Sequence, residues 1–357
     1  MASNKSAMGK EEGKQICSFE SCLNRTNLNY TPECCSDQHK PALAEGTKII
    51  LISIHVFLII VSVFGNSLVL KAFHKFSSLR TASNVILVSL CAADSLIAIA
   101  YIPRIILIIT LRDEPWSRRS VLCMASAWFS FLLLSVIILH LALISFERLI
   151  AVKFPLRYKS IVTKRRALIA AIAVWLWVLA VTIVVPQVLR LNSKVAYTLL
   201  RQSLHPCSET KEGRPEELPP STKGYLIFLV TSTLVIPLVI ILCSYGYIFI
   251  VSHKHRKQIR DQGNIQEIIT AIKHETRGAR TLAIVVVVCL LSIFPLLVVW
   301  SLRYSRALRV SRQPELKSVK YIVYDVAFGL NAICNPLIYA WRNEKFRSSF
   351  RKLLKCA

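Results

Sequence analysis

Near its C-terminus the chain reads Asn331-Ala-Ile-Cys-Asn335-Pro336-Leu-Ile-Tyr339, inside an apolar run from Tyr321 to Trp341. A helix of about 20 apolar residues is long enough to cross a bilayer. Within such a helix a proline removes a backbone hydrogen bond, and an asparagine is costly in lipid unless it has a partner. Packing alone can account for one proline beside one asparagine. The spacing of Asn335, Pro336 and Tyr339, followed by a basic amphipathic tail, instead favours a functional element in the last span.

The composition of the chain is that of a membrane protein. Its mean hydropathy is +0.50 and 54% of its residues are hydrophobic, which excludes an ordinary soluble domain. The apolar runs long enough to span a bilayer are Ile49–Leu70, Val85–Leu111, Val121–Phe146, Ala167–Val188, Tyr225–Val251, Leu282–Trp300 and Tyr321–Trp341. The sequence therefore predicts an all-α membrane protein, a seven-transmembrane helix bundle over residues 49–341. An N-terminal arm (1–48) precedes this bundle, and a short amphipathic eighth helix with the tail (342–357) follows it.

Cysteines and glycosylation sequons indicate the orientation better than charge does. The net charge is +25, but the basic residues lie in short loops between spans, which is typical of membrane flanks rather than of a nucleic-acid-binding face. Because the basic residues are almost equally divided between the two sides of the membrane, the positive-inside rule barely decides the orientation of the chain. The sequons at Asn24 and Asn29 share one side with six cysteines, as suits an oxidising exterior. We therefore expect a plasma-membrane protein with an extracellular N-terminus, the outer cysteines being Cys17, Cys22, Cys34, Cys35, Cys123 and Cys207.

The start of the chain bears on how it enters the membrane. The polar stretch from Met1 to Lys14 lacks the apolar core of a signal peptide. The first span is therefore expected to act as its own insertion signal.

Polar residues inside the predicted spans are candidates for function. Asp94 lies within the second span, where a carboxylate is costly unless it is paired or solvated. Asn66 lies in the first span between two small residues, a pattern that by itself favours helix packing. We expect Asn66, Asp94 and the two asparagines of the last span to form one polar cluster. The third span ends with a charged pair, Glu147-Arg148.

These motifs resemble those of rhodopsin-like (class A) G-protein-coupled receptors, and the resemblance extends from about residue 49 to residue 356. The last span carries the NPxxY motif, and Glu147-Arg148-Leu149 resembles the E/DRY motif. The resemblance implies a disulfide between Cys123 and Cys207. It also implies activation by an outward movement of helix six, in which Arg148 is released from Glu275. The implied switch comprises Asn66, Asp94, Glu147, Arg148, Pro237, Tyr245, Glu275, Pro295, Asn331, Asn335, Pro336 and Tyr339.

Two positions depart from the family pattern, and two tryptophans are candidates for a third position. A serine of helix three often helps to hold sodium in this family, but Ile137 stands there and offers no oxygen. A water network is therefore expected at Asp94, with a sodium site as the alternative. Ile293 replaces the tryptophan that usually triggers helix six, although the kink proline is kept. In span four, Trp177 best matches the family tryptophan, and Trp175 is expected at the interface or in lipid.

The resemblance places the ligand, a small molecule or a peptide, between the outer halves of the helices. Asp325 either receives a ligand cation or pairs with Arg104, since helices two and seven are neighbours in this fold; both alternatives stay open. Ser130 stands where aminergic receptors carry an aspartate, which disfavours a monoamine, and the last span has no lysine for retinal. The ligand-binding candidates are Arg104, Ser130, Phe131, Leu134, Trp300 and Asp325.

The tail completes the membrane-receptor prediction. Phe346, Phe350 and Leu353 recur at helical spacing among basic residues, which predicts an amphipathic helix on the membrane surface. Cys356 is a palmitoylation candidate because of its juxtamembrane position. The implied partners are an extracellular ligand, a heterotrimeric G protein, arrestin, a receptor kinase and the lipid bilayer, with no nucleic acid and no cofactor.

A second class of function remains an alternative. Asp94, Asp325 and His140 could form the ion path of a seven-span transporter or channel. That alternative leaves the Glu147-Arg148 pair and the NPxxY motif unexplained. No metal-ligand cluster, phosphate-binding loop or nucleophile–base motif in the sequence indicates an enzyme.

Overall fold

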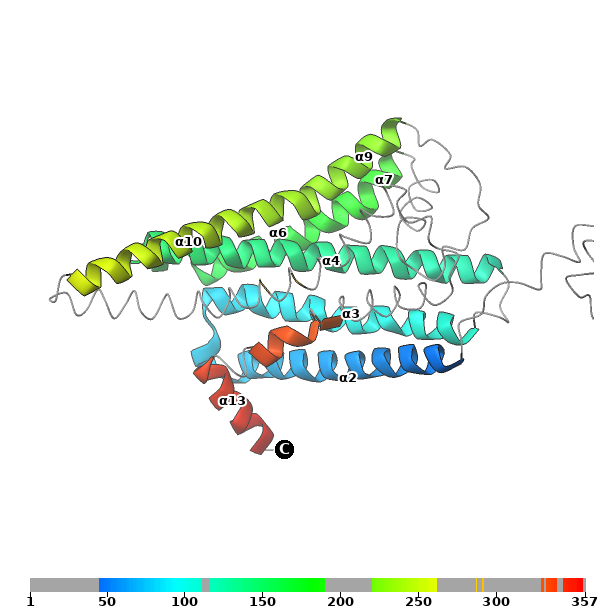
Figure 1. Ribbon diagram of the computed structural model, residues 1–357, viewed down its shortest axis with the longest axis horizontal. Helices are drawn as coiled ribbons and strands as arrows, with labels where there is room; N and C mark the ends of the chain where they lie inside the picture. The colour runs from blue at the N-terminus through cyan, green and yellow to red at the C-terminus, as the bar shows by residue number, and fades with distance from the viewer. Residues whose placement is uncertain are drawn as a thin grey trace, which may run out of the picture. The chain divides into compact units, whose positions relative to one another are not determined.

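The computed structural model describes residues 45–110, 116–189, 220–261, 287, 291, 329–330, 332–338 and 343–355. Within these ranges the chain consists of helices and the short links between them (Figure 1). The longer helices are α2 (Glu45–Lys75), α3 (Ala82–Thr110), α4 (Trp116–Lys153), α6 (Lys164–Leu179), α9 (Pro220–Val230), α10 (Ile236–Asp261) and α13 (Glu344–Lys355). The shorter elements are η1 (Ser77–Leu79), α5 (Tyr158–Ile161), η2 (Ala180–Val184), α7 (Val185–Val188) and η3 (Thr231–Val235).

Five stretches of the described chain are long and apolar enough to cross a membrane. They are Lys48–Lys75, Ala82–Pro103, Trp128–Lys153, Lys164–Val188 and Pro220–Val251, and they correspond to the first five predicted spans. The helices extend beyond the apolar runs, and the polar residues at their ends are also helical. Most of the predicted sixth and seventh spans lies outside the described residues; within them only 287, 291, 329–330 and 332–338 are described, and these are helical.

Helix α4 lies at the centre of the described helices, in contact with α3, α6 and α10. Its neighbour α3 also packs against α2, so that α2, α3 and α4 lie side by side (Figure 1). The most deeply buried stretch of α4 runs from Leu133 to Ala151, where apolar side chains alternate with buried polar ones such as His140 and Ser145. Burial of polar side chains in a span requires hydrogen-bond partners.

Helix α2 shows how the sequence orients a span. Its buried side chains recur every three or four residues, as one face of an α-helix requires; they are Leu51, His55, Leu58, Ser62, Asn66, Val69 and Ala72. The opposite face exposes large apolar side chains such as Phe57 and Phe64, which suit contact with lipid. Gly65 lies against the last span, since a Cβ atom there would be 2.7 Å from Pro336 Cγ.

Two helices contain a π turn that ends two residues before a proline. The turn Ala180–Val184 precedes Pro186, and the turn Thr231–Val235 precedes Pro237. A proline lacks an N–H group and its ring crowds the carbonyl four residues earlier, so a wider turn relieves the contact. In the first turn the Val185 N–H bonds to the Ala180 carbonyl, which leaves the next carbonyl facing the proline. The Tyr225 hydroxyl donates to that Val181 carbonyl at 2.7 Å and joins α9 to η2.

The amphipathic helix predicted after the last span is present as α13. Asn343 precedes it, and the Asn343 Oδ1 atom accepts hydrogen bonds from the backbone N–H groups of Lys345 and Phe346 at 3.1 and 3.3 Å. Such a side chain satisfies amides that a helix start leaves unpaired. The buried Phe346 and Phe350 belong to the main core, and α13 packs against α2 and η1.

Candidate functional site

The first polar cluster joins three helices in the middle of the bundle. Asn335 Nδ2 donates to Asp94 Oδ2 at 2.6 Å, and Asn66 Nδ2 donates to the Ala332 carbonyl at 3.0 Å. Each of these bonds connects the last span to an earlier helix. Asn66, Asp94 and Asn335 are fully buried, with exposed fractions of 0%, 0% and 1%. The structure therefore brings these three predicted residues together, while Asn331 and Tyr339 lie outside the described residues.

Ser62 is a member of this cluster that the sequence analysis missed. Its hydroxyl donates to the backbone carbonyl of Asp94 at 2.9 Å, and its own carbonyl accepts from Asn66 Nδ2 at 3.0 Å. Ser62 precedes Asn66 by four residues, about one helical turn, so the two side chains lie on the same face of α2. This spacing could have identified Ser62 as a member of the cluster from the sequence. The contact fixes α2 against α3 beside the Asp94 carboxyl group.

The described part of the cluster leaves two buried oxygens without a partner. Asp94 Oδ1 and Asn66 Oδ1 are buried acceptors without a hydrogen-bond partner within the described residues. Ordered water and hard cations both bind buried oxygens of this kind. The fully buried Ile137 supplies no oxygen, and the expected water network with its alternative, a sodium site, stays a prediction. Among the described residues no group of three metal-ligating side chains occurs.

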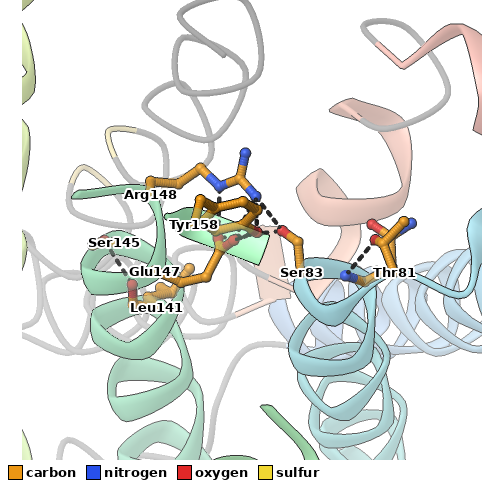
Figure 2. A network of polar contacts seen from close by, with 8 residues as sticks. Thr81, Ser83, Leu141, Ser145, Glu147, Arg148 and Tyr158 are labelled. Carbon is orange, nitrogen blue, oxygen red and sulfur yellow. Dashed lines mark hydrogen bonds and ion pairs between the residues drawn. The ribbon is translucent and has the colours of Figure 1, made fainter. Parts of the chain in front are cut away.

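The second polar cluster lies at the end of α4 that carries the Glu147-Arg148 pair (Figure 2). Arg148 makes a two-point contact with Glu147, with Nε to Oε2 at 2.6 Å and Nη2 to Oε1 at 2.7 Å. The Glu147 side chain is 3% exposed and that of Arg148 is 11% exposed. A buried ion pair needs further hydrogen bonds to offset the loss of solvation.

Ser83 and Tyr158 supply these further hydrogen bonds. Arg148 Nη2 donates to Ser83 Oγ at 2.7 Å, and Ser83 Oγ in turn lies 3.3 Å from Glu147 Oε2. The Tyr158 hydroxyl donates to Glu147 Oε1 and lies 3.5 Å from Arg148 Nη2. Figure 2 shows Ser83 of α3 and Tyr158 of α5 converging on the pair from two sides. We name these four residues the Arg148 cluster.

The Arg148 cluster contains contacts that sequence reasoning did not assign. Ser83 and Tyr158 carried no predicted role, although Tyr158 follows Pro155-Leu156 in the loop that the family resemblance covers. The predicted partner Glu275 lies outside the described residues, as does Pro295. Tyr245 lies on α10, and its buried hydroxyl lies near Ser145 and the Glu147-Arg148 pair. Pro237 lies in the first turn of the same helix.

A third polar cluster corrects the interpretation of the two tryptophans in span four. Trp175 Nε1 donates to Ser89 Oγ at 3.0 Å, and Ser89 Oγ lies 2.8 Å from His140 Nε2. Trp175 therefore faces α3 and α4, and its placement at the interface or in lipid was wrong. Trp177 is 44% exposed and makes an edge contact with Phe228, 6.3 Å between ring centroids.

The environment of His140 bears on the alternative of an ion path. Its Nδ1 lies 2.8 Å from the Val136 carbonyl, and its Nε2 faces Ser89. An imidazole with Nδ1 protonated satisfies both contacts, because Ser89 can then donate to Nε2. His140 thus has a structural role that accounts for its burial without ion transfer.

The predicted ligand-binding residues are only partly described. Ser130 is buried in α4, Phe131 packs against a small cluster of Val181, Tyr225 and Leu229, and Leu134 packs against the main core. Arg104 and Cys123 lie on α3 and α4, but their side chains are outside the described part of the chain. Also outside the described residues are Trp300, Asp325, Cys207, Asn24, Asn29 and Cys356.

Comparisons with known proteins agree with this arrangement. The family model described as "7 transmembrane receptor (rhodopsin family)" matches residues 65–339. The adenosine receptor A2b of Canis lupus familiaris is 30% identical, over 87% of this chain and 91% of the relative. The QRFP-like peptide receptor of Branchiostoma floridae is 25% identical, over 88% and 80% of the two chains. The alpha-1A adrenergic receptor of Oryzias latipes is 28% identical, over 90% and 70%.

Proposed function

Because the chain belongs to the rhodopsin family of seven-transmembrane receptors, we propose that it binds an extracellular ligand and activates a heterotrimeric G protein. Its relatives are signalling receptors rather than enzymes. Activation of a G protein requires a change that starts at the ligand and ends at the cytoplasmic side. Such a change is a shift between two populated conformations, driven by a ligand that binds one of them more tightly.

The Arg148 cluster is the observation that supports this proposal most directly. Arg148 is held by Glu147 and Ser83 in a buried, hydrogen-bonded arrangement. In the proposed resting state the guanidinium is therefore directed to groups of the receptor itself. Activation breaks these contacts, and Arg148 with Tyr245 and Tyr339 then faces the G protein. Glu275 of helix six adds a further contact to the resting state.

The loop after α4 offers a surface for the G protein. Leu156 is 97% exposed and lies between the end of α4 and α5. Burying a fully exposed leucine next to the Arg148 cluster in an apolar pocket of a partner would remove its apolar surface from water, which favours binding there. The same cytoplasmic side is proposed to bind arrestin and a receptor kinase. We assign the N-terminus to the opposite, extracellular side, with glycans on Asn24 and Asn29.

The ligand is proposed to lie between the outer halves of the helices. The relatives are receptors for adenosine, for a peptide and for adrenergic ligands, so they do not select one chemical class. A small molecule or a peptide therefore remains the proposed ligand, with Arg104, Ser130, Phe131, Leu134, Trp300 and Asp325 as candidates to contact it. The Cys123–Cys207 disulfide would shape the cavity, and palmitate on Cys356 would anchor the end of α13.

A cell-based assay of G-protein activation tests the proposal. The wild type is screened against a ligand library with a promiscuous G protein, and Arg148→Ala is compared at equal surface expression. We expect an agonist response in the wild type that Arg148→Ala abolishes. The control is Arg165→Ala, which removes an exposed cation at the start of α6. An ion flux that survives Arg148→Ala, without any G-protein activation, would instead support the transporter alternative.

A further inference from the structure

The four-residue helix α5 is held by a side chain from the following helix. Arg166 of α6 donates from Nη1 to the Ile161 carbonyl at 2.8 Å and to the Ser160 carbonyl at 3.0 Å. Its backbone N–H bonds to Thr163 Oγ1 at 3.3 Å, which fixes the start of α6. A single arginine side chain therefore donates to the last two carbonyl groups of α5, while its own backbone N–H is bonded to Thr163.

Besides Arg166, helix α5 is held by the contact of Tyr158 with Glu147 and by a hydrogen bond from Ser160 Oγ to the Arg157 carbonyl at 2.8 Å. It buries none of its side chains, and no side chain caps its N-terminus. One helical turn is unfavourable by itself, because several dihedral angles are fixed for one hydrogen bond. The terminal carbonyls of a helix also lack partners within the helix, and a cation near them is favourable. The Arg166 guanidinium supplies both the hydrogen-bond donors and the positive charge.

The position of α5 matters because Tyr158 is its first residue. The Tyr158 hydroxyl donates to Glu147 Oε1, so α5 carries one of the groups that complete the Arg148 cluster. If α5 unwinds, the hydroxyl leaves the carboxylate that holds Arg148. The fully exposed Leu156 and the exposed Arg157 lie immediately before this turn and supply no competing anchor in the bundle.

We infer that Arg166 is a positioning residue which sets the resting activity of the receptor by holding Tyr158 against Glu147. This inference rests on the proposed function of the Arg148 cluster. Arg166 touches neither Glu147 nor Arg148 in the contacts above and acts through α5. The expected effect of losing one hydrogen bond from the resting state is a rise of about fivefold in the active population.

The test measures agonist-independent G-protein activation at equal surface expression. Arg166→Ala is expected to raise the basal signal by about fivefold, and Tyr158→Phe, which removes a hydrogen bond to a carboxylate, by about tenfold or more. The double variant is expected to match Tyr158→Phe alone, because Arg166 has no effect once the hydroxyl is absent. Arg166→Lys, which keeps the cation, is expected to lie between wild type and Arg166→Ala. The adjacent, exposed Arg165 is not the donor to these carbonyls, and Arg165→Ala is expected to leave the basal signal unchanged.

A second measurement does not depend on signalling. Hydrogen–deuterium exchange of the purified receptor should increase over residues 158–162 in Arg166→Ala but not in Arg165→Ala. Unchanged exchange in Arg166→Ala overturns the inference, and so does a double variant whose signal exceeds that of Tyr158→Phe. Glu147→Ala separates this failure from that of the proposed function. If Glu147→Ala raises the basal signal and Arg166→Ala does not, the inference about Arg166 alone fails. If hydrogen–deuterium exchange rises in Arg166→Ala but Glu147→Ala leaves the basal signal unchanged, the switch role of the Arg148 cluster fails.

Discussion

Replacing Gly65 with alanine tests how closely α2 approaches the last span. An alanine Cβ would lie 2.7 Å from Cγ and 3.1 Å from Cβ of Pro336. Ordinary contacts begin near 3.4 Å, so the two helices must separate by about 0.7 Å, the difference between 3.4 and 2.7 Å. A proline ring cannot rotate away as a long side chain can, which leaves movement of the backbone as the response.

The expected loss of stability follows from this separation. Overpacking of a core contact costs about 1–3 kcal/mol. The hydrogen bond from Asn66 Nδ2 to the Ala332 carbonyl is 3.0 Å, and a further 0.7 Å would break it at a net cost of about 1 kcal/mol. Alanine regains about 0.5–1 kcal/mol because it is a better helix former than glycine. We therefore expect Gly65→Ala to destabilise the receptor by about 1–3 kcal/mol.

Thermal unfolding of the purified receptor in detergent measures this change. The matched control is Gly246→Ala in α10, where a Cβ would meet no atom within 4 Å. The control should be unchanged or more stable by about 0.5–1 kcal/mol. A Gly65→Ala variant that is as stable as Gly246→Ala would refute the close approach of α2 to Pro336.

Three further predictions concern other contacts of the same bundle. Trp175→Phe removes the donor to Ser89 and should lower the free energy of unfolding by about 1–3 kcal/mol, whereas Trp177→Phe should be nearly neutral; thermal unfolding compares the two. If water rather than sodium fills the cluster at Asp94, sodium chloride and choline chloride at equal ionic strength should give the same unfolding midpoint; a sodium-dependent rise that Asp94→Asn abolishes would instead support a sodium site. Asn343→Ala removes the cap of α13 and should cost about 1 kcal/mol, seen as faster amide exchange in the first turn of that helix.

The membrane class of the protein and its motifs were predictable because their signals are local in the sequence. A run of apolar residues reports a span by length alone, and the spacing of Phe346, Phe350 and Leu353 reports one helix face. The pairing of Asn335 with Asp94 was also expected, since an isolated polar group in a span needs a partner. None of these inferences required knowledge of how one helix is rotated relative to another.

Residues whose role depends on that rotation were missed or misplaced. Trp175 and Trp177 are two positions apart, so they point to nearly opposite sides of their helix. Either side could face the bundle until α3 supplied Ser89 as a partner for Trp175. In the same way Ser83 and Tyr158 are ordinary polar residues until their elements bring both hydroxyls to the Glu147-Arg148 pair.

The amino-acid sequence by itself determined that the chain crosses the membrane repeatedly, that its last span carries Asn335 and Pro336, and that an amphipathic helix follows. The tertiary structure decided which hydroxyl groups complete the two clusters around Asp94 and Arg148. The physical reason is that hydropathy and helical period are properties of a single segment. A hydrogen bond between helices depends on their mutual rotation and distance, to within a few tenths of an ångström.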